Sequence, residues 1–394
     1  MISLADTDFC TGCGACAFAC PKQCISMKSN EIGIIYPVIN YTECILCNRC
    51  QKVCPILSPV DYNTPIHAYA AWSCNDCERS TSASGGIAAE IYKYSIANGR
   101  KIVGAVQQKD FSVSLQMSDK EECIAKFKNS KYVFSTAYSL FPIIKNELKK
   151  NNKITVIGLP CQIAALRKLF PKHDNLLLVD LVCHGTTPHD YLVQHIHTLE
   201  KECANKAVRM SFRDPETYTY TFTFTLYDAE GKRFCERKIE DGDAYQVGYH
   251  KKITYRENCY HCPFAKNVRM GDLTIADYHG LGLCAPCSFS NRDVSLILSN
   301  TDKGEIWVQE LIENKKIIAY ERPLEEPIKG EVQLRHPSTK TAERRDFEKL
   351  YRGDFTQTMA FVLRNRQRRE RVRVTKQMIK NRIKKILYIL SHRK

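Results

Sequence analysis

CTGCGACAFACP, residues 10–21, and CILCNRCQKVCP, residues 44–55, repeat one cysteine spacing with an offset of 34 residues. Each reads C-x2-C-x2-C-x3-C-P, which is typical of bacterial ferredoxin modules with [4Fe–4S] clusters, where the fourth cysteine of each run ligates the other cluster. Two zinc sites are the alternative, but zinc favours C-x2-C pairs separated by a longer spacer. We therefore predict one cluster on Cys10, Cys13, Cys16 and Cys54, and the other on Cys44, Cys47, Cys50 and Cys20.

The composition predicts a cytoplasmic protein of two or three domains. The chain has 394 residues, of which 44% are apolar, enough for more than one core. It contains no run of roughly 18 apolar residues that would span a membrane. The start, MISLADTDFC, has neither a basic nor an apolar region of a secretory signal. In a reducing compartment the 20 cysteines are ligands or free thiols rather than disulfides.

The positive charge is concentrated at the C-terminus. Residues 361–394 hold 13 Lys and Arg and one acid, Glu370, whereas the rest of the chain is nearly neutral. Apolar residues recur there at helical spacing, at Ile379, Ile383, Ile386, Leu387 and Leu390. A basic amphipathic helix is typical of a peripheral membrane contact or a partner-binding element. The alternative is a helix that packs on its own body. Nucleic acid binding is disfavoured, because no helix-turn-helix or zinc-finger pattern accompanies the charge.

Between these ends, strand and helix patterns alternate. We expect strands at 67–72, 101–106, 153–159, 176–182, 217–225, 273–276 and 294–298, and helices at 85–98, 138–150 and 163–170. No G-x-G-x-x-G follows a strand, so a Rossmann site is unsupported. The predicted class is α+β, with a ferredoxin-like module at 1–60, a mixed α/β body at 61–150 and 151–345, and a basic helical tail at 346–394.

Four body cysteines follow strand ends or turns. Cys161 and Cys183 come after neighbouring predicted strands, and Cys259 and Cys262 form a C-x2-C pair. Such positions bring loops together at one sheet edge, so the four predict a third cluster or, alternatively, buried small hydrophobic side chains. Two further pairs, Cys74/Cys77 and Cys284/Cys287, are weak evidence of a site. The isolated cysteines Cys24, Cys123, Cys203 and Cys235 are interpreted as structural or incidental.

Residues 80–86, STSASGG, precede the predicted helix that begins near Ile87. Hydroxyls and glycines at a helix N-terminus can cradle an anion, because free N–H groups and the helix dipole point at it. The pyrophosphate of a flavin is one candidate ligand. An ordinary helix cap after a glycine turn is the other interpretation.

A series of motifs resembles the beta-subunit family of coenzyme F420 hydrogenases and dehydrogenases. They are RSTSASGGI at 79–87, SKYVFS at 130–135, GLPCQIAA at 158–165, DLVCHG at 180–185, YRENCYHCPFA at 255–265 and RMGDLTIADYHG at 269–280. The resemblance covers roughly residues 1–300. Asn129 departs from it, since a glycine is more usual there, and the tail has no counterpart. The substrate is therefore not carried over.

The resemblance implies an FAD-containing iron–sulfur oxidoreductase with a third cluster on Cys161, Cys183, Cys259 and Cys262. A flavin joins one-electron clusters to a two-electron hydride acceptor. The resemblance implies that Lys131 contacts the flavin or the substrate, as a catalytic residue. Independently of the resemblance, histidine is the common proton shuttle, so His184 or His261 is a candidate proton donor near the flavin; the alternative is a loop histidine with satisfied hydrogen bonds. The implied cofactor-binding residues are Ser82, Ser84, Gly85, Gly86, Ser130, Lys131, Tyr132, Ser135, Gly158, Pro160, Gly185, Arg269 and Asp277.

The expected partners follow from the same resemblance. They are an organic substrate or a deazaflavin, and a redox protein such as ferredoxin or a dehydrogenase subunit. The alternative is an electron-transfer subunit of a larger hydrogenase or dehydrogenase complex without a substrate of its own.

Overall fold

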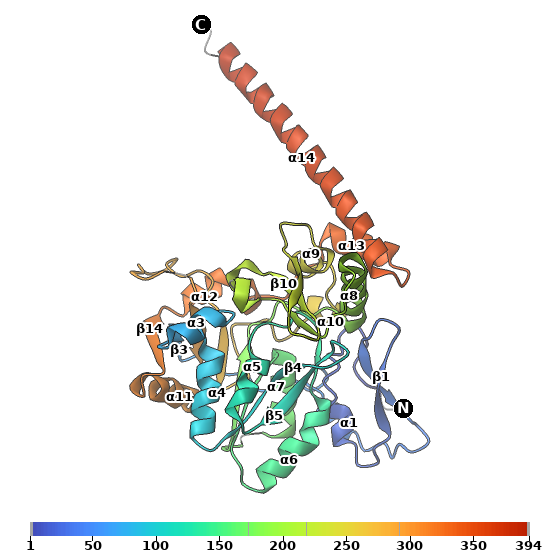
Figure 1. Cartoon of the computed structure of the whole chain (residues 1–394). Coiled ribbons are helices and arrows are strands. Elements are labelled where there is room, and N and C mark those ends of the chain that lie inside the picture. Colours follow the sequence, from blue (N-terminus) through green and yellow to red (C-terminus); the bar gives the residue numbers. More distant parts are fainter. Residues whose placement is uncertain (1–2, 172, 218, 291, 392–394) are drawn as a thin grey trace.

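The computed structural model describes residues 3–171, 173–217, 219–290 and 292–391. Within these ranges the body is built on one large sheet, whose strands are β3 (His67–Ser73), β4 (Lys101–Gln107), β5 (Val113–Ser118), β6 (Ser135–Thr136), β7 (Ile154–Gly158), β8 (Leu176–Leu181), β12 (Leu273–Asp277), β13 (Ser295–Ser299) and β14 (Ile317–Arg322). Their order is β14-β3-β13-β12-β8-β7-β4-β5-β6 (Figure 1). The mixed α/β body predicted from the alternating pattern is confirmed.

The middle of the sheet is parallel and covered on both faces. Strands β4, β7, β8 and β12 run parallel to their neighbours in this group. Successive side chains point to opposite faces, so Ile157 packs in one core and Val156 in the other. Helices α4 (Ile87–Ala97) and α11 (Asp302–Glu313) cover the first face, and α6 (Phe141–Lys149) and α7 (Pro160–Leu169) cover the second. The carboxyl ends of the parallel strands therefore meet at one edge.

A second, smaller sheet packs beside this edge. It contains β9 (Arg209–Ser211), β10 (Phe224–Tyr227) and β11 (Arg233–Arg237). Helices α8 (His189–Cys203), α9 (Ala244–His250), α13 (Ala342–Leu350) and the start of α14 (Phe355–Ser391) share its apolar core. Short helices complete the described body: α3 (Asp76–Thr81), α5 (Ile124–Phe127), α10 (Glu257–Tyr260) and α12 (Glu325–Gly330), with 3-10 turns at Glu121–Cys123, Tyr138–Leu140 and Val332–Leu334.

The strand predicted at 217–225 is wrong over most of its length. The structure has 3-10 turns at Pro215–Thr217 and Thr219–Thr221, and only β10 is extended. Phe222 adopts a left-handed φ of 51°, which a strand does not allow. The Arg213 guanidinium lies 4.2 Å from the centre of its ring. The described part of this segment therefore forms turns before β10, and Phe222 packs against Arg213.

The N-terminal module has two short helices and a hairpin. They are α1 (Ala15–Ala19), α2 (Arg49–Lys52), β1 (Ile25–Ser29) and β2 (Ile35–Ile39). Its interior is formed largely by cysteines together with Ile25. Ala15 and Phe18 reach out of the module and join the core beneath α6 and α7. The module is thus docked through α1 on the face of the sheet that α6 and α7 cover (Figure 1).

Helix α14 begins inside the body and then projects away from it (Figure 1). Phe355, Met359 and Val362 are fully buried in the core of the smaller sheet. Farther along, Ile379 and Ile383 are 52% and 51% exposed. The side chains of Ile386, Leu387 and Leu390 lie outside the described part of the chain. The first turns of α14 therefore pack on the body, whereas Ile379 and Ile383 do not.

Candidate functional site

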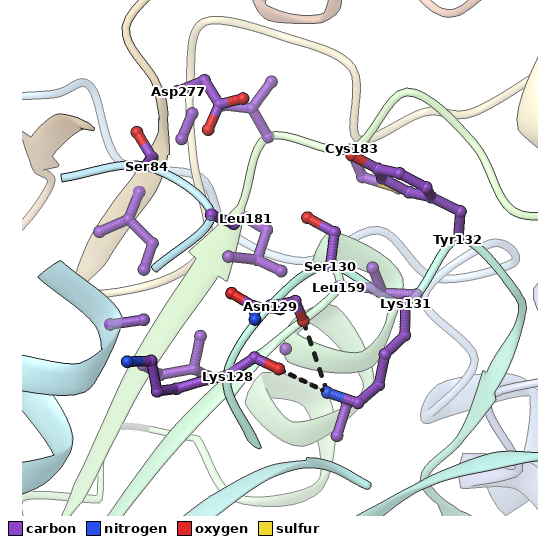
Figure 2. A pocket seen from close by; sticks show the side chains of 18 of the residues that line it. Ser84, Lys128, Asn129, Ser130, Lys131, Tyr132, Leu159, Leu181, Cys183 and Asp277 are labelled. Atoms are coloured by element: carbon purple, nitrogen blue, oxygen red, sulfur yellow. Dashed lines mark hydrogen bonds between the residues drawn. The ribbon is translucent and has the colours of Figure 1, made fainter. Parts of the chain in front are cut away.

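A cavity of about 300 Å³ opens at the carboxyl edge of the large sheet. Its walls come from the 82–89 segment, the 127–135 segment, the ends of β7, β8 and β12, and single residues that include Arg213, Tyr249 and Glu331 (Figure 2). Cavities of this size and position bind ligands in many α/β proteins. The site is therefore assembled from loops that are distant in sequence but adjacent at the sheet edge.

Most of the predicted cofactor-binding residues line this cavity. They are Ser82, Ser84, Gly86, Ser130, Lys131, Tyr132, Ser135, Gly158, Gly185 and Asp277, together with His184. Three predicted residues are not part of its lining: Gly85, Pro160 and Arg269. Each of these three has a structural role in the neighbouring fold.

Gly85 is required by a close approach of backbones. A Cβ atom at this position would lie 2.5 Å from the Ala71 carbonyl oxygen of β3 and 2.9 Å from the Ser295 nitrogen of β13. Gly86 caps α4 with a left-handed φ of 83°. Pro160 is the first residue of α7, where a missing N–H costs no hydrogen bond. A bulky substitution of Gly85 would therefore disturb the sheet itself, whatever ligand the cavity holds.

Arg269 forms a buried ion pair with Asp180. Both side chains are at most 1% exposed, and Nε of Arg269 donates to Oδ1 of Asp180 at 2.9 Å. The guanidinium also donates to the carbonyls of Phe264, Lys266 and Leu181. Because these partners occupy the guanidinium, it fixes the loop before β12 onto the end of β8. That placement orients the chain that continues into Cys183.

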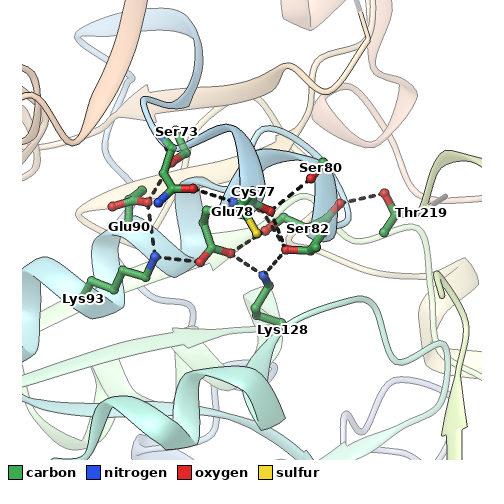
Figure 3. A network of polar contacts seen from close by, with 11 residues as sticks. Ser73, Cys77, Glu78, Ser80, Ser82, Glu90, Lys93, Lys128 and Thr219 are labelled. Atoms are coloured by element: carbon green, nitrogen blue, oxygen red, sulfur yellow. Dashed lines mark hydrogen bonds and ion pairs between the residues drawn. The ribbon is translucent and has the colours of Figure 1, made fainter. Parts of the chain in front are cut away.

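The serine- and glycine-rich segment is held by a polar network (Figure 3). Glu78 accepts from Ser82 Oγ at 3.0 Å and pairs with Lys128 and, at 2.7 Å, with Lys93. Burial opposes ionisation of Glu78, yet the bonds from Lys128 and Lys93 lower its pKa. Thr219 donates to the Ser82 carbonyl at 2.7 Å. The network ties the 82–86 segment to the 127–135 segment across the cavity mouth.

Lys131 is a half-buried cation in the cavity wall. Its Nζ donates to the carbonyls of Lys128 at 2.9 Å and Asn129 at 3.4 Å, as Figure 2 shows. None of the ion pairs among the described residues includes Lys131. Burial lowers the pKa of Lys131 to about 8. A positive charge without a carboxylate partner is therefore available to an anionic ligand.

Two neighbouring features explain the shape of this loop. Asn129 has a left-handed φ of 64°, which explains why asparagine can stand where a glycine is more usual. Its buried Oδ1 atom has no hydrogen-bond partner among the described residues. Both Asn129 and Lys131 line the cavity, so the loop offers one unused acceptor and one unpaired cation.

A polar chain of three residues links this loop to the end of β12. Arg213 donates from Nε to the Tyr132 hydroxyl at 2.9 Å and pairs with Asp277 at 2.6 Å. Tyr132 stacks on Tyr249 with ring centroids 4.2 Å apart. Burial raises the pKa of Tyr132, and the Arg213 charge opposes that rise. The phenol is therefore a neutral hydrogen-bond donor or acceptor at neutral pH.

His184 lies at the exposed rim of the cavity. Its Nε2 is 3.2 Å from Oε1 of Glu331, and its side chain is 40% exposed. Burial opposes ionisation of Glu331, but His184 lowers the pKa of that carboxyl. His261 does not line the cavity and lies 3.2 Å from Glu257 on α10. Of the two predicted proton donors, His184 is the one at the cavity.

The four body cysteines come together behind the cavity. They are Cys161, Cys183, Cys259 and Cys262, and Cys183 also lines the cavity. Burial raises the pKa of Cys161 well above its ordinary value, and the charges of the three other thiols raise it further. Burial likewise raises the pKa of Cys262 to about 11. All four are half-buried, and thiols that repel one another as thiolates suit a cationic iron–sulfur core.

The N-terminal cysteines lie in two groups, and their swapped assignment to two clusters stays a prediction. Cys10, Cys13, Cys16 and Cys54 act on one another electrostatically. Cys20, Cys44, Cys47 and Cys50 line a second, small cavity. Cys24 lines that cavity too, with its sulfur 3.4 Å from that of Cys20, so it is not incidental.

Arg256, which lies in the quoted YRENCYHCPFA motif but was not singled out there, connects the two cysteine regions. Nη1 donates to the Thr11 carbonyl at 3.0 Å, and the guanidinium lies 4.0 Å from the Phe134 ring centre. Burial raises the pKa of Cys10 and of Cys161, and the Arg256 charge opposes both rises. The side chain is 2% exposed, and its Nε and Nη2 atoms have no partner among the described residues.

Several other residues of the site were also not predicted from the sequence. They are Lys128, Asn129 as an acceptor, Arg213, Tyr249 and Glu331. Gln162 belongs with them, since it accepts from the Leu159 N–H at 2.9 Å and donates to Ser135 at 2.9 Å. Because the partners of these residues are remote in the chain, the spacing of residues in the sequence does not indicate them.

Comparison with known proteins identifies two regions of the chain. Residues 9–56 match the 4Fe-4S dicluster domain. Residues 151–323 match the family described as the C terminus of the coenzyme F420 hydrogenase/dehydrogenase beta subunit. The resemblance to the coenzyme F420 hydrogenase/dehydrogenase beta-subunit family is confirmed. The dicluster prediction for the N-terminal module is confirmed by the match over residues 9–56.

Individual relatives are more distant. The F subunit of the F420H2 dehydrogenase of Methanosarcina mazei is 22% identical over 268 residues, 65% of this chain and 71% of that protein. The coenzyme F420-dependent sulfite reductase of Methanocaldococcus jannaschii is 32% identical over 181 residues, 43% of this chain but 27% of that protein. A chain of the F420-reducing [NiFe] hydrogenase complex from Methanosarcina barkeri has a TM-score of 0.46 at 18% identity, covering 78% of this chain and 93% of that chain.

Proposed function

We propose that this beta-subunit relative is an iron–sulfur flavoprotein oxidoreductase. FAD would lie in the cavity, exchange electrons with the [4Fe–4S] clusters and exchange a hydride with an organic substrate or a deazaflavin. When bound, a flavin converts one-electron into two-electron transfer. The observation that carries the proposal is that Cys183 lines the same cavity as Lys131 and the 82–86 segment.

The chain's own residues fit such a cofactor. The amide groups of Ile87, Ala88 and Ala89 lie at the N-terminus of α4 and line the cavity, where they favour a phosphate group. Lys131 adds a positive charge, and the free Oδ1 of Asn129 accepts one hydrogen bond. Leu181 and Ile275 provide apolar wall for a ring system. Tyr132, held by Arg213, and His184, held by Glu331, are two proton-bearing groups in the cavity lining.

The third cluster belongs to the same proposal. Cys161, Cys183, Cys259 and Cys262 would hold it between the dicluster module and the cavity. Arg256 supports this order, because its charge acts on both Cys10 and Cys161. Electrons would then pass from a redox partner protein through the module to the body cluster and the cavity. The names of the relatives, a dehydrogenase subunit and a reductase that depends on F420, support a deazaflavin and a protein partner.

An electron-transfer subunit without a substrate of its own is the second candidate. It is favoured by the relative that is named as a subunit and matches over 71% of its length. The two functions differ in what reaches the cavity: a diffusible substrate in the first, and electrons from a neighbouring subunit in the second.

Anaerobic purification with iron, sulfide and flavin analysis tests the proposal. We expect about twelve iron atoms and one FAD per chain, four iron atoms per cluster. Cys183→Ala should remove about four iron atoms and leave the dicluster module intact. Cys77→Ala, an exposed cysteine outside the cavity, is the matched control. About eight iron atoms in the unaltered protein, or protein free of flavin, would contradict the proposal.

A further inference from the structure

An exposed C-x2-C pair stands in the loop after β12, outside the cluster cysteines and the cavity. Cys284 is exposed and Cys287 is half-buried, and both are free thiols. The loop continues from His279, which lines the cavity, so the pair is close to the site along the chain. Neither cysteine has a part in the proposed function.

The backbone of this loop is fixed by a buried carboxylate. Glu326 on α12 is fully buried. Its Oε1 accepts from the N–H groups of Gly282 at 3.0 Å and Cys284 at 3.2 Å. Its Oε2 accepts from the Tyr278 hydroxyl at 2.9 Å. A buried charge is costly unless it is fully satisfied, so this clamp holds the loop in one conformation.

A buried arginine completes the clamp from the other side. Arg322 on β14 pairs with Glu326 at 2.8 Å. The same guanidinium donates to the carbonyls of Ala285 at 2.6 Å and Pro286 at 3.0 Å, the two residues between the cysteines. The bond from Arg322 lowers the pKa of Glu326 to about 2, although burial opposes it. The turn between the thiols is thus held at both its N–H and its carbonyl groups.

The two sulfur atoms have different environments. The ammonium of Lys329 donates from Nζ to the exposed sulfur of Cys284 at 3.5 Å. The Cys287 thiol donates to the Phe289 carbonyl at 3.3 Å and is less exposed. An exposed thiol beside a cation, followed at the third position by a shielded thiol, is the arrangement of an attacking and a resolving cysteine.

The second exposed pair of the chain provides a contrast. Cys74 and Cys77 are both exposed, and they flank the start of α3. Burial and the Glu90 charge raise the pKa of Cys74, which disfavours its thiolate. Both pairs share the C-x2-C spacing and an exposed first cysteine, but the Lys329 ammonium lies beside the 284–287 pair.

We propose that Cys284 and Cys287 form a redox-active dithiol that exchanges with small disulfides. The Cys284 thiolate attacks one sulfur of the disulfide, forms a mixed disulfide and releases the first thiol. Cys287 then loses its proton, attacks the Cys284 sulfur and releases the second thiol. The protein pair is oxidised by two electrons to a disulfide, and the small disulfide is reduced to two thiols. The inference does not depend on the flavin or on the third cluster.

Oxidised glutathione is the probe for an anaerobic test on the full-length protein with its clusters. After alkylation of the remaining thiols, peptide mass spectrometry should find a Cys284–Cys287 disulfide in the unaltered protein. Cys287→Ser should retain glutathione on Cys284, whereas Cys284→Ser should show neither product. Lys329→Met should slow the reaction at pH 7 severalfold, and Lys329→Arg should largely restore it.

The pair Cys74/Cys77 serves as the internal control, and it should react more slowly than Cys284. Equal rates at both pairs would overturn the proposal, because exposure alone would then explain the reaction. A metal ion beyond the cluster iron, lost in Cys284→Ser, would overturn it in favour of a metal-binding pair. Iron and sulfide content should be the same in every variant, so failure here stays separate from failure of the proposed function.

Discussion

Lys131 is the residue whose charge most directly tests the cavity. Burial lowers its pKa to about 8. Below that pH the ammonium is present in the free protein and attracts an anionic ligand. Above it the free protein holds a neutral amine, so binding an anion must take up a proton. We therefore expect the affinity of flavin-stripped protein for FAD to fall by up to about tenfold per pH unit above pH 8.

Fluorescence titration with FAD from pH 6 to 9.5 measures this dependence. Lys131→Met should bind more weakly at pH 7 and lose the slope near pH 8. Lys126→Met, which removes an exposed ammonium from the neighbouring helix α5, should keep the slope. The other charged groups in the lining are Lys128, Arg213, His184, His279, Glu331 and Asp277. A slope that persists in Lys131→Met would assign the pH dependence to one of them.

Arg256 is expected to set the potential of the clusters beside it. A buried cation stabilises the more negative, reduced state of a cluster, so its loss should lower the reduction potential. Redox titration monitored by electron paramagnetic resonance should show a lower midpoint for Arg256→Met and a smaller shift for Arg256→Lys. Arg49 is exposed next to Cys50, and Arg49→Met should have little effect because water and salt screen its charge. Equal shifts in Arg256→Met and Arg49→Met would refute this role.

At the scale of elements, the Asp180–Arg269 pair joins β8 to the loop before β12. Asp180→Ala would leave the Arg269 guanidinium buried without its anion, at a cost of about 3–5 kcal/mol. Urea unfolding should therefore show a large loss of stability. The exposed pair of His67 and Glu321 is the control, since Glu321→Ala should cost at most about 1 kcal/mol. Similar losses in both variants would show that Asp180 is not specially coupled to Arg269.

The elements also show what the sequence could predict. The apolar runs of β7 and β8 are long enough to identify buried parallel strands, and Cys161 and Cys183 follow their ends directly. The false strand at 217–225 has the same alternation as a real strand. The segment is not a strand because Phe222 has a left-handed backbone and packs against Arg213, and no sequence pattern reveals either feature.

Contacts between residues far apart in the sequence could not be predicted either, because no local pattern reveals them. Arg256 reaches Thr11, which lies 245 residues earlier, and Arg213 bonds to the Ala83 carbonyl. Gly85 was expected to approach a ligand, yet the structure shows it against β3 and β13. The residue types were enough to indicate where the site lies. The role of each residue became clear only from the residues that pack against it.

At the scale of the whole molecule, the basic helix extends away from the body, and peripheral membrane contact stays a prediction. None of the described helices is long and apolar enough to cross a bilayer. Each Lys or Arg near an anionic surface contributes about 1 kcal/mol, screened by salt. Deleting residues 372–394 removes eight Lys and Arg residues. The shortened chain keeps the buried Val362 and the ion pairs of Arg369 with α13.

Flotation with anionic vesicles should recover the full-length protein at low salt, and much less of it at high salt. The shortened chain should not float but should keep its iron and flavin. Vesicles of neutral lipid are the control for the charge, since they should recover little of either form. Equal recovery of both forms on anionic vesicles would exclude the helix as the contact.

Strand β3 lies between β13 and β14, so its two neighbours are encoded more than 220 residues later. A ribosome adds about 5–20 residues per second, so the strand waits roughly ten to fifty seconds for residue 322. During synthesis its apolar residues are open to chaperones and to misassembly. The dicluster segment, in contrast, is complete by residue 56. Iron–sulfur assembly factors can therefore load the N-terminal module on a nascent chain, whereas cysteines 161–262 become a group only later. Oxygen stress or slow translation should then damage the body before the module.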